Sequence, residues 1–249
     1  MKKKIIEINN IKFEYQKNQK VFKDISLDIY EGETLGIIGS NGAGKSTLLK
    51  LIVGLNEFDF GKMLIDGIDL NKKTIKEVRE KIGYTFQESD NQLFMTTVYE
   101  DVAFGPRNYG LNEKQVRKVS EKALNDVGAL HLSNRPAYKL SGGEKRLITI
   151  ATVLSMNPEI IILDEPTTGL DPKGRRSIIQ LLKKLKQTKI IATHDMDLAL
   201  EICDRIVVMH KGDIYDKGLP LDIFNNDELL KKSNLEKPFS IQGCPICSK

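Results

Sequence analysis

The sequence predicts an α/β fold: a mainly parallel sheet flanked by helices, with an N-terminal antiparallel β-layer and an inserted helical subdomain. β-rich runs at residues 5–8, 11–15 and 25–29 open the chain, separated by turn-prone Asn and Gly residues. From residue 158 onward apolar strands alternate with helices, which is typical of a parallel sheet. Between these parts, residues 91–154 have helical spacing and few strand signals, which predicts the helical insertion.

The other predicted elements follow in chain order. Residues 34–39 form a short apolar strand that runs into a glycine-rich loop, and residues 45–54 have helical spacing that ends at a glycine. Helices are expected inside the insertion at 112–127 and 141–156. After it, alternating strands and helices are expected at 158–163, 172–185, 189–193, 196–203, 205–210 and 214–216. We expect a main domain over residues 1–224 and a C-terminal extension over 225–249, ending in a loosely packed tail.

Composition and charge exclude several classes of protein. The 249 residues are 40% hydrophobic and 29% charged, as in an ordinary globular protein. The net charge is only +4 and the basic residues cluster mildly, so we expect no nucleic-acid partner. No run approaches the roughly 18 apolar residues that cross a bilayer, so a cytoplasmic location is expected.

The three cysteines are too few for a disulfide framework. Cys203 lies in an apolar helical stretch and is expected to pack in the core. Cys244 and Cys247 supply two thiolates, which is half of a tetrahedral zinc site. A pair from each of two subunits would complete such a site, and a reduced tail without metal is the alternative.

A phosphate-binding loop is predicted where the first apolar strand meets a helix. Residues 39–46 fit the pattern G-x-x-x-x-G-K-[ST] in the structural context that its mechanism requires. Glycines let backbone N–H groups converge on phosphates, the helix N-terminus adds a positive dipole, and the lysine adds a full charge. A turn that merely caps a helix would not need every fixed position of the pattern. The residues predicted to bind a nucleotide's phosphates are Gly39, Ser40, Asn41, Gly42, Ala43, Gly44, Lys45, Ser46 and Thr47, with Ser46 also holding Mg²⁺.

Two carboxylates end the apolar strand at residues 160–165, where the second half of a nucleotide site is expected. Asp164 is expected to bind Mg²⁺ through water, and Glu165 to polarise the attacking water. Such a pair more often caps a following helix or turn. The phosphate-binding loop elsewhere in the chain favours the functional interpretation.

A second anion site is predicted at residues 140–144. Ser141 can cap the helix that follows, and Gly142 and Gly143, which have no side chains, leave its N-terminal N–H groups exposed. A phosphate held by Lys45 need not lie within reach of Ser141 in the same molecule. A dimer would resolve this geometric problem.

These motifs, in this order over residues 5–224, resemble those of the ABC ATPases. The resemblance implies a P-loop NTPase (RecA-like) fold and two composite sites in a head-to-tail dimer. Because every motif is intact in this chain, a homodimer would have two competent sites. In the signature loop, residues 140–144, the chain departs from the commonest form by Glu144 in place of Gln. The resemblance further implies base stacking by Tyr15, a Q-loop glutamine at Gln87, a D-loop at Gly169, Leu170 and Asp171, and a γ-phosphate contact from His194. The implied catalytic residues are Glu165, His194, Lys45 and Gln87. The implied Mg²⁺ ligands are Ser46, Gln87 and Asp164. Ser141 and Gly143 would bind the ATP that is held by the partner chain.

Residues 87–111 are similar to the energy-coupling-factor ATPases, a group that includes the cobalt and nickel importers. This implies a membrane coupling protein and a substrate-binding membrane protein as partners, and a peripheral place on the cytoplasmic face of the cell membrane. Phe94 and Met95 are expected either to dock the coupling protein or to pack in the helical subdomain. Importers of a vitamin or an amino acid remain alternatives. A mechanoenzyme acting on nucleic acid is disfavoured, because the short interval between Gln87 and Ser141 leaves no room for a long coiled coil.

Overall fold

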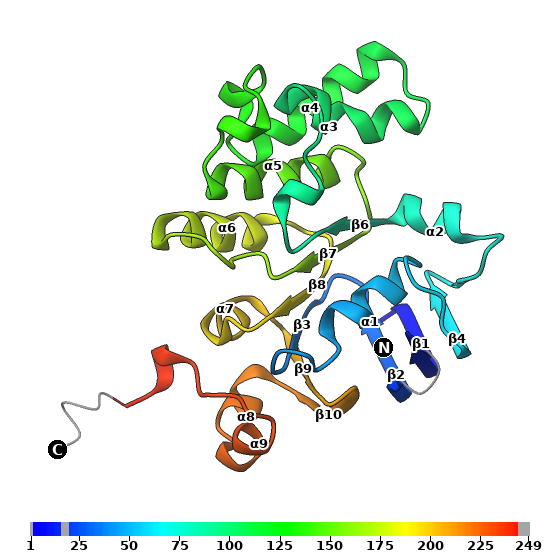
Figure 1. The fold of residues 1–249 in the computed structure, drawn as a ribbon, viewed down its shortest axis with the longest axis vertical. Coiled ribbons are helices and arrows are strands. Elements are labelled where there is room, and N and C mark those ends of the chain that lie inside the picture. Colours follow the sequence, from blue (N-terminus) through cyan, green and yellow to red (C-terminus); the bar gives the residue numbers. More distant parts are fainter. Residues whose placement is uncertain (1, 16–19, 244–249) are drawn as a thin grey trace. The chain divides into compact units, whose positions relative to one another are not determined.

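A computed structural model describes residues 2–15 and 20–243 of the chain (Figure 1). The chain divides into two compact units. The first unit comprises residues 1–78 and 188–249, and the second comprises residues 79–187. Each unit is described separately. Among the described residues, no helix has the length and apolar character needed to cross a membrane.

The first unit contains the predicted antiparallel β-layer. Its strand order is β2 (Lys20–Tyr30), β1 (Lys4–Glu14), β4 (Phe60–Ile65) and β5 (Ile68–Asp69). The prediction of two strands at 5–8 and 11–15 is wrong, because β1 is one continuous strand. Asn10 adopts a positive φ of 52° inside this strand, and the register with β2 shifts between Ile8 and Ile11. The asparagines that predicted a turn therefore form an irregularity within a longer strand.

The first unit also carries a parallel strand group that positions the phosphate-binding loop. β3 (Thr34–Ile38) pairs in parallel with both β8 (Thr188–Thr193) and β9 (Arg205–His210). β10 (Asp213–Gly218) pairs antiparallel with β9. Every residue of β3 and β8 is buried, which explains why both strands are mostly apolar or β-branched, although β8 also contains the buried Lys189. The helices of this part are α1 (Lys45–Ile52) and α7 (Met196–Ile202).

The end of the first unit packs on the same core as β3. Ile38, Cys203, Phe224, Leu229 and Leu230 form one buried cluster, to which α8 (Pro220–Phe224) and α9 (Asp227–Lys232) contribute. The predicted core position of Cys203 is confirmed, although this residue follows α7 instead of lying inside it. Burial raises the pKa of its thiol to about 12. A short 3₁₀ turn at Phe239–Ile241 follows, and Cys244 and Cys247 lie outside the described residues.

The second unit combines two parallel strands with a group of helices. α2 (Ile75–Lys81) contains the boundary between the two units and leads into β6 (Ile82–Thr85), which pairs in parallel with β7 (Ile160–Asp164). α3 (Val98–Asn108), α4 (Glu113–Asp126) and α5 (Gly142–Leu154) pack against one another. α6 (Pro172–Lys184) follows β7, and three short 3₁₀ turns occur at Ser89–Asn91, Leu130–Leu132 and Ala137–Lys139. The helices predicted at 112–127, 141–156 and 172–185 are confirmed by α4, α5 and α6, whereas α2, α3 and β6 were not predicted.

Candidate functional site

The loop between β3 and α1 depends on glycine at several positions. Gly42 has φ 79° and Gly44, the N-cap of α1, has φ 105°, conformations that other residues rarely adopt. A Cβ on Gly44 would lie 2.7 Å from a ring carbon of Phe22, and one on Gly39 would lie 2.4 Å from the carbonyl oxygen of Met209. The backbone can therefore take this path only where no side chain intervenes.

Lys45 is folded back over the same loop. Its Nζ donates to the carbonyl oxygen of Gly39 at 2.7 Å and to that of Ser40 at 3.4 Å. The residue is buried, although lysine is rarely buried without partners. Because α1 begins at Lys45, the positive end of its dipole lies at the loop as well. Full charge and helix dipole thus coincide, which suits a polyphosphate.

Tyr15 lies beside the end of the phosphate-binding loop. Its hydroxyl oxygen is 3.1 Å from that of Thr47, and its ring packs edge-on against Phe13 with the centroids 4.9 Å apart. The side chain is half exposed. The structure therefore brings the residue predicted to stack on the base next to a residue predicted to bind phosphate.

His194 emerges at the same sheet edge as the phosphate-binding loop. Ile38 pairs with Thr193 in the parallel register of β3 and β8, so Gly39 and His194 are the next residues at the carboxyl ends of neighbouring strands. The Thr193 hydroxyl accepts the N–H of Asp195, and Asp195 caps α7. The turn that presents His194 is therefore fixed on its C-terminal side, and the histidine itself is exposed.

In the second unit, β6 and β7 place Gln87 and the two carboxylates at one edge. Thr85 pairs with Leu163, so Asp164, the last residue of β7, and Gln87, which follows β6, lie at the carboxyl ends of neighbouring strands. Asp164 is buried and accepts a hydrogen bond from the Tyr84 hydroxyl at 3.2 Å. Tyr84 was not among the predicted site residues.

Glu165 has a strained backbone. Its φ is 50°, in the left-handed region that costs a residue with a side chain about 1–2 kcal/mol, and the residue is only 6% exposed. The Thr168 hydroxyl donates to its Oε2 at 3.3 Å. Strained conformations of this kind cluster at functional sites. The orientation of this carboxylate is therefore set by a conformation that the surrounding fold holds in place.

The residues predicted for Mg²⁺ have the right chemistry. Ser46 offers a hydroxyl in the first unit, and Gln87 and Asp164 offer an amide oxygen and a carboxylate in the second. Mg²⁺ is a hard cation that prefers oxygen ligands and carboxylates in particular. Each of these oxygen donors is therefore of a kind that suits a magnesium ion.

Arg146 is a buried residue of the site that sequence reasoning missed. It is 3% exposed and donates to the carbonyl oxygens of Phe86 at 2.8 Å, Gln87 at 2.6 Å and Glu165 at 3.4 Å. Burial lowers the pKa of its guanidinium, while the charges of Asp164 and Glu165 oppose that shift. Arg146 thus ties α5 to both predicted catalytic segments of the second unit. Its position on the buried face of α5 was the signal available in the sequence.

Gln92 reinforces this link between the Q-loop and α5. Its Oε1 accepts the N–H of Phe86, and its Nε2 donates to the Thr149 carbonyl oxygen and the Thr152 hydroxyl. Gln92 therefore binds the backbone N–H of Phe86, while Arg146 binds the carbonyl oxygens of Phe86 and Gln87.

Substitution of Arg146 by Met should destabilise the protein and slow ATP hydrolysis. The change leaves the carbonyl oxygens of Phe86, Gln87 and Glu165 without this donor. Glu165 is buried, and an unsatisfied buried polar group costs about 1–3 kcal/mol. Urea denaturation and phosphate release measure the two effects. Arg146→Lys is the control, because it keeps the charge without the planar fork and should recover only part of the loss. Full stability and full activity in Arg146→Met would contradict this structural role.

The signature loop forms a capped helix start with a pocket beside it. The Ser141 hydroxyl accepts the N–H of Glu144 at 3.3 Å, and Glu144 in turn accepts the Ser141 N–H at 2.8 Å, so that a capping box opens α5. A pocket of about 520 Å³ adjoins it, lined by the signature loop, the D-loop and the first turns of α6. Its wall includes Ser141, Gly143, Glu144, Leu170, Asp171 and Gly174. This pocket belongs wholly to the second unit.

Each unit thus gathers one set of the predicted residues. The first unit brings together Tyr15, the loop at residues 39–47 and the turn at His194. The second unit brings together Gln87, residues 164–165 and, through Arg146, the helix that begins at the signature loop.

Comparison with known proteins identifies the family. The family model described as "ABC transporter" matches residues 22–168. A putative ABC transporter ATP-binding protein of Geobacter sulfurreducens is 47% identical over 245 residues, covering 98% of both chains. The energy-coupling factor transporter ATP-binding protein EcfA of Methanocaldococcus jannaschii is 43% identical over 239 residues, covering 94% of this chain and 86% of the relative.

Solved structures give the same result. CbiO1 from Clostridium perfringens, part of the ABC transporter complex CbiONQ, superposes with a TM-score of 0.83 at 40% identity, covering 93% of this chain and 94% of that one. A dimeric ATP-binding cassette in a post-hydrolysis state with ADP and Pi superposes with a TM-score of 0.78 at 30% identity, covering 86% and 98%. The chain therefore belongs to the ABC transporter ATP-binding family and is an ATPase of its energy-coupling-factor type.

Proposed function

We propose that this ATPase powers an importer of cobalt or nickel ions, and that it works as a head-to-tail homodimer enclosing two ATP molecules. The observation that carries the dimer is the signature-loop pocket, which is lined by residues within the range 141–177. This serine- and glycine-rich helix start is suited to phosphate, and none of the described residues that line its pocket belongs to the phosphate-binding loop. A second copy would supply the phosphate. The likeness to a dimeric cassette that holds ADP and Pi supports this arrangement.

Within each composite site the residues would divide the work. The phosphate-binding loop and Lys45 hold the phosphates, while Ser46, Gln87 and Asp164 hold Mg²⁺. The ion would neutralise charge on the phosphate oxygens. Glu165 accepts a proton from the attacking water and orients it toward the γ-phosphate.

Contacts to the γ-phosphate would make the dimer sensitive to hydrolysis. His194 contacts this phosphate from the same chain, and the partner's Ser141 and the partner's Gly143 contact it from the other. Because ATP joins two protein faces, its binding stabilises the dimer, and its hydrolysis removes the bridge. This cycle of closing and opening would drive the membrane partners.

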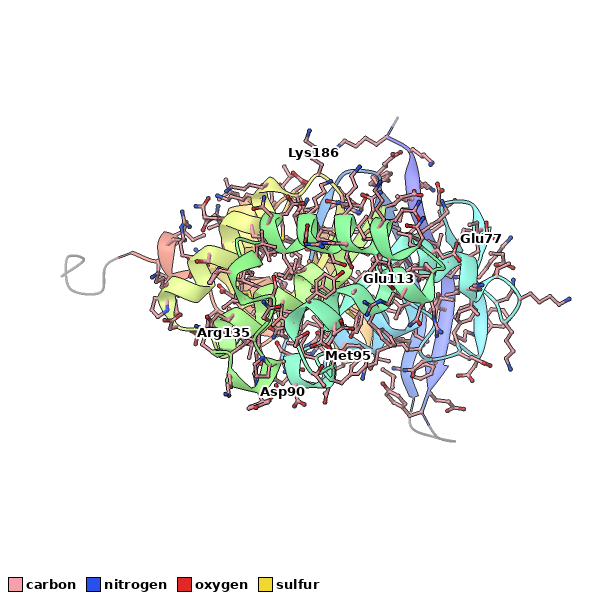
Figure 2. All side chains as sticks on the ribbon, turned by 90° about the horizontal axis from the view of Figure 1, so that it is seen from above. Glu77, Asp90, Met95, Glu113, Arg135 and Lys186 are labelled. Carbon is pink, nitrogen blue, oxygen red and sulfur yellow. The ribbon has the colours of Figure 1, made fainter. Side chains whose placement is uncertain are left out.

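An exposed aromatic pair in the second unit supports docking to a membrane protein. Phe94 is 63% exposed and packs edge-on against the partly exposed Phe104, with the centroids 5.0 Å apart. The buried carboxylate of Asp101 accepts the backbone N–H groups of both Phe94 and Met95 at 2.9 Å. Met95 is labelled in Figure 2. Asp101 therefore holds the segment in a conformation that turns Phe94 outward. An exposed aromatic of this kind favours the docking role over the core role.

The importer is tested by purification from membranes. A tagged chain, isolated from detergent-solubilised native membranes, should retain a coupling protein and a substrate-binding protein. Phe94→Asp should lose both while ATP hydrolysis by the isolated subunit stays unchanged. Phe60→Asp is the matched control, because Phe60 is similarly exposed but lies on β4 of the first unit. Retention of both proteins by Phe94→Asp would contradict the docking surface.

The cargo is tested with the same purified complex. Reconstituted into vesicles, it should take up labelled Co²⁺ or Ni²⁺ only when ATP is enclosed in the lumen, because an importer moves its cargo toward the face that carries the ATPase. A complex that hydrolyses ATP and moves neither ion would contradict this cargo and favour a vitamin or an amino acid.

A further inference from the structure

A carboxylate stands in the wall of the proposed phosphate pocket. Glu144 lines this pocket together with Ser141 and Gly143. Its Oε2 accepts both the backbone N–H of Ser141 at 2.8 Å and the Ser141 hydroxyl at 2.9 Å. The negative group is therefore bonded to the same serine that would bind a phosphate oxygen.

Glu144 is ionised under ordinary conditions. The hydrogen bonds from the Ser141 N–H and then from its hydroxyl lower the pKa of this carboxyl, and the charges of Arg135 and His131 lower it further (Arg135 is labelled in Figure 2). A full negative charge thus lies at the start of α5, where it also favours the helix dipole.

The bond between the two side chains has a cost for phosphate binding. A serine hydroxyl has one proton to donate, and in this structure it points to Glu144. A γ-phosphate that takes this proton must break the bond to the carboxylate. The phosphate is also repelled by a like charge within the same pocket. A glutamine at this position would impose no such repulsion, since its side chain is neutral.

We infer that Glu144 restrains closure of the dimer, by competing with the partner's γ-phosphate for the Ser141 hydroxyl and by repelling that phosphate. The inference rests on the proposed composite site. Glu144 would act as a positioning residue. With glutamate at this position, the two chains of the ATP-bound dimer would bind each other less tightly than with the commoner glutamine, and the closed state would be shorter-lived.

Glu144→Gln isolates the charge from the helix cap. A capping box accepts either Glu or Gln at its fourth position, so the start of α5 should keep its geometry and its stability. Glu144→Asp is the second variant, since it keeps the charge in a shorter side chain. The control is Glu121→Gln, which neutralises an exposed carboxylate on α4 of the same unit.

The experiment measures dimer dissociation constants by analytical ultracentrifugation with saturating ATP, in a Glu165→Gln background that does not turn over. Adding Glu144→Gln should tighten the dimer roughly tenfold at low ionic strength, and the gain should shrink as salt screens the repulsion. Adding Glu144→Asp, which keeps the charge, should tighten the dimer less than Glu144→Gln does, and adding Glu121→Gln should leave the constant within about twofold of the parent. Thermal unfolding of each protein checks that its fold is retained.

Two outcomes distinguish a failure of the Glu144 restraint from a failure of the proposed composite site. A Glu165→Gln parent that dimerises with ATP, together with no tightening or a weakening by Glu144→Gln, overturns the restraint alone. A parent that stays monomeric at saturating ATP overturns the composite site, and the restraint with it.

Discussion

Glu165→Gln is expected to bind ATP as the wild type does, to lose hydrolysis by roughly 10²- to 10⁴-fold, and to accumulate as an ATP-loaded dimer. The amide has nearly the shape of the carboxylate but cannot accept a proton from water. The backbone at φ 50° imposes the same strain on either side chain, so the fold should be unaffected. Phosphate release measures the turnover, and size-exclusion chromatography with light scattering measures the dimer.

The control for this variant is another glutamate of the second unit. Glu159 is half exposed and pairs with Lys81 at 2.8 Å. Glu159→Gln should leave turnover unchanged, since a surface ion pair is worth at most about 1 kcal/mol and lies outside the proposed site. Wild-type hydrolysis by Glu165→Gln would refute the assignment of the catalytic base.

Lys45→Ala should weaken nucleotide binding itself. The wild-type ammonium is buried against the Gly39 and Ser40 carbonyl oxygens, where it would meet the phosphates of ATP. A hydrogen bond to a charged group contributes about 1.5–3 kcal/mol, which corresponds to a loss of roughly 10- to 150-fold in affinity. Titration of a fluorescent ATP analogue gives the dissociation constant.

The matched control is Lys50→Ala. Lys50 lies in the last turn of the same helix, so its removal changes the net charge equally but leaves the phosphate-binding loop intact. Affinity should stay within about twofold of wild type. Equal affinities for Lys45→Ala and the wild-type protein would show that the loop does not hold the phosphates.

The phosphate-binding loop could be predicted from sequence because its geometry is local. The positive φ of Gly42 and Gly44 and the close approach at Gly39 leave few alternatives to glycine, so the pattern of residues reflects the path of the backbone. The cap of α5 is local in the same way, since Ser141 and Glu144 satisfy each other's backbone within one turn.

Other features could not be predicted because they depend on distant partners. The Asn9–Asn10 pair predicts a turn by local chemistry, but pairing of β1 with both β2 and β4 keeps the strand continuous. Arg146 has a recognisable place on a buried helix face, yet its acceptors at Phe86, Gln87 and Glu165 are 19 or more positions away. Long-range acceptors of this kind leave no mark in the spacing of residues.

The composite site is tested most directly by mixing two inactive proteins, Lys45→Ala and Gly143→Asp. A Cβ on Gly143 would meet its nearest neighbour, the Gly174 Cα, at an ordinary 3.7 Å, so the aspartate should fit while placing a negative charge at the phosphate pocket. In a mixed dimer, one site combines Lys45 of one chain with Gly143 of the other, and both are native. Hydrolysis in the mixture should recover to about a quarter of the wild-type rate, because random pairing makes half the dimers mixed, each with one intact site. A mixture as inactive as its two components would contradict a site shared between two chains.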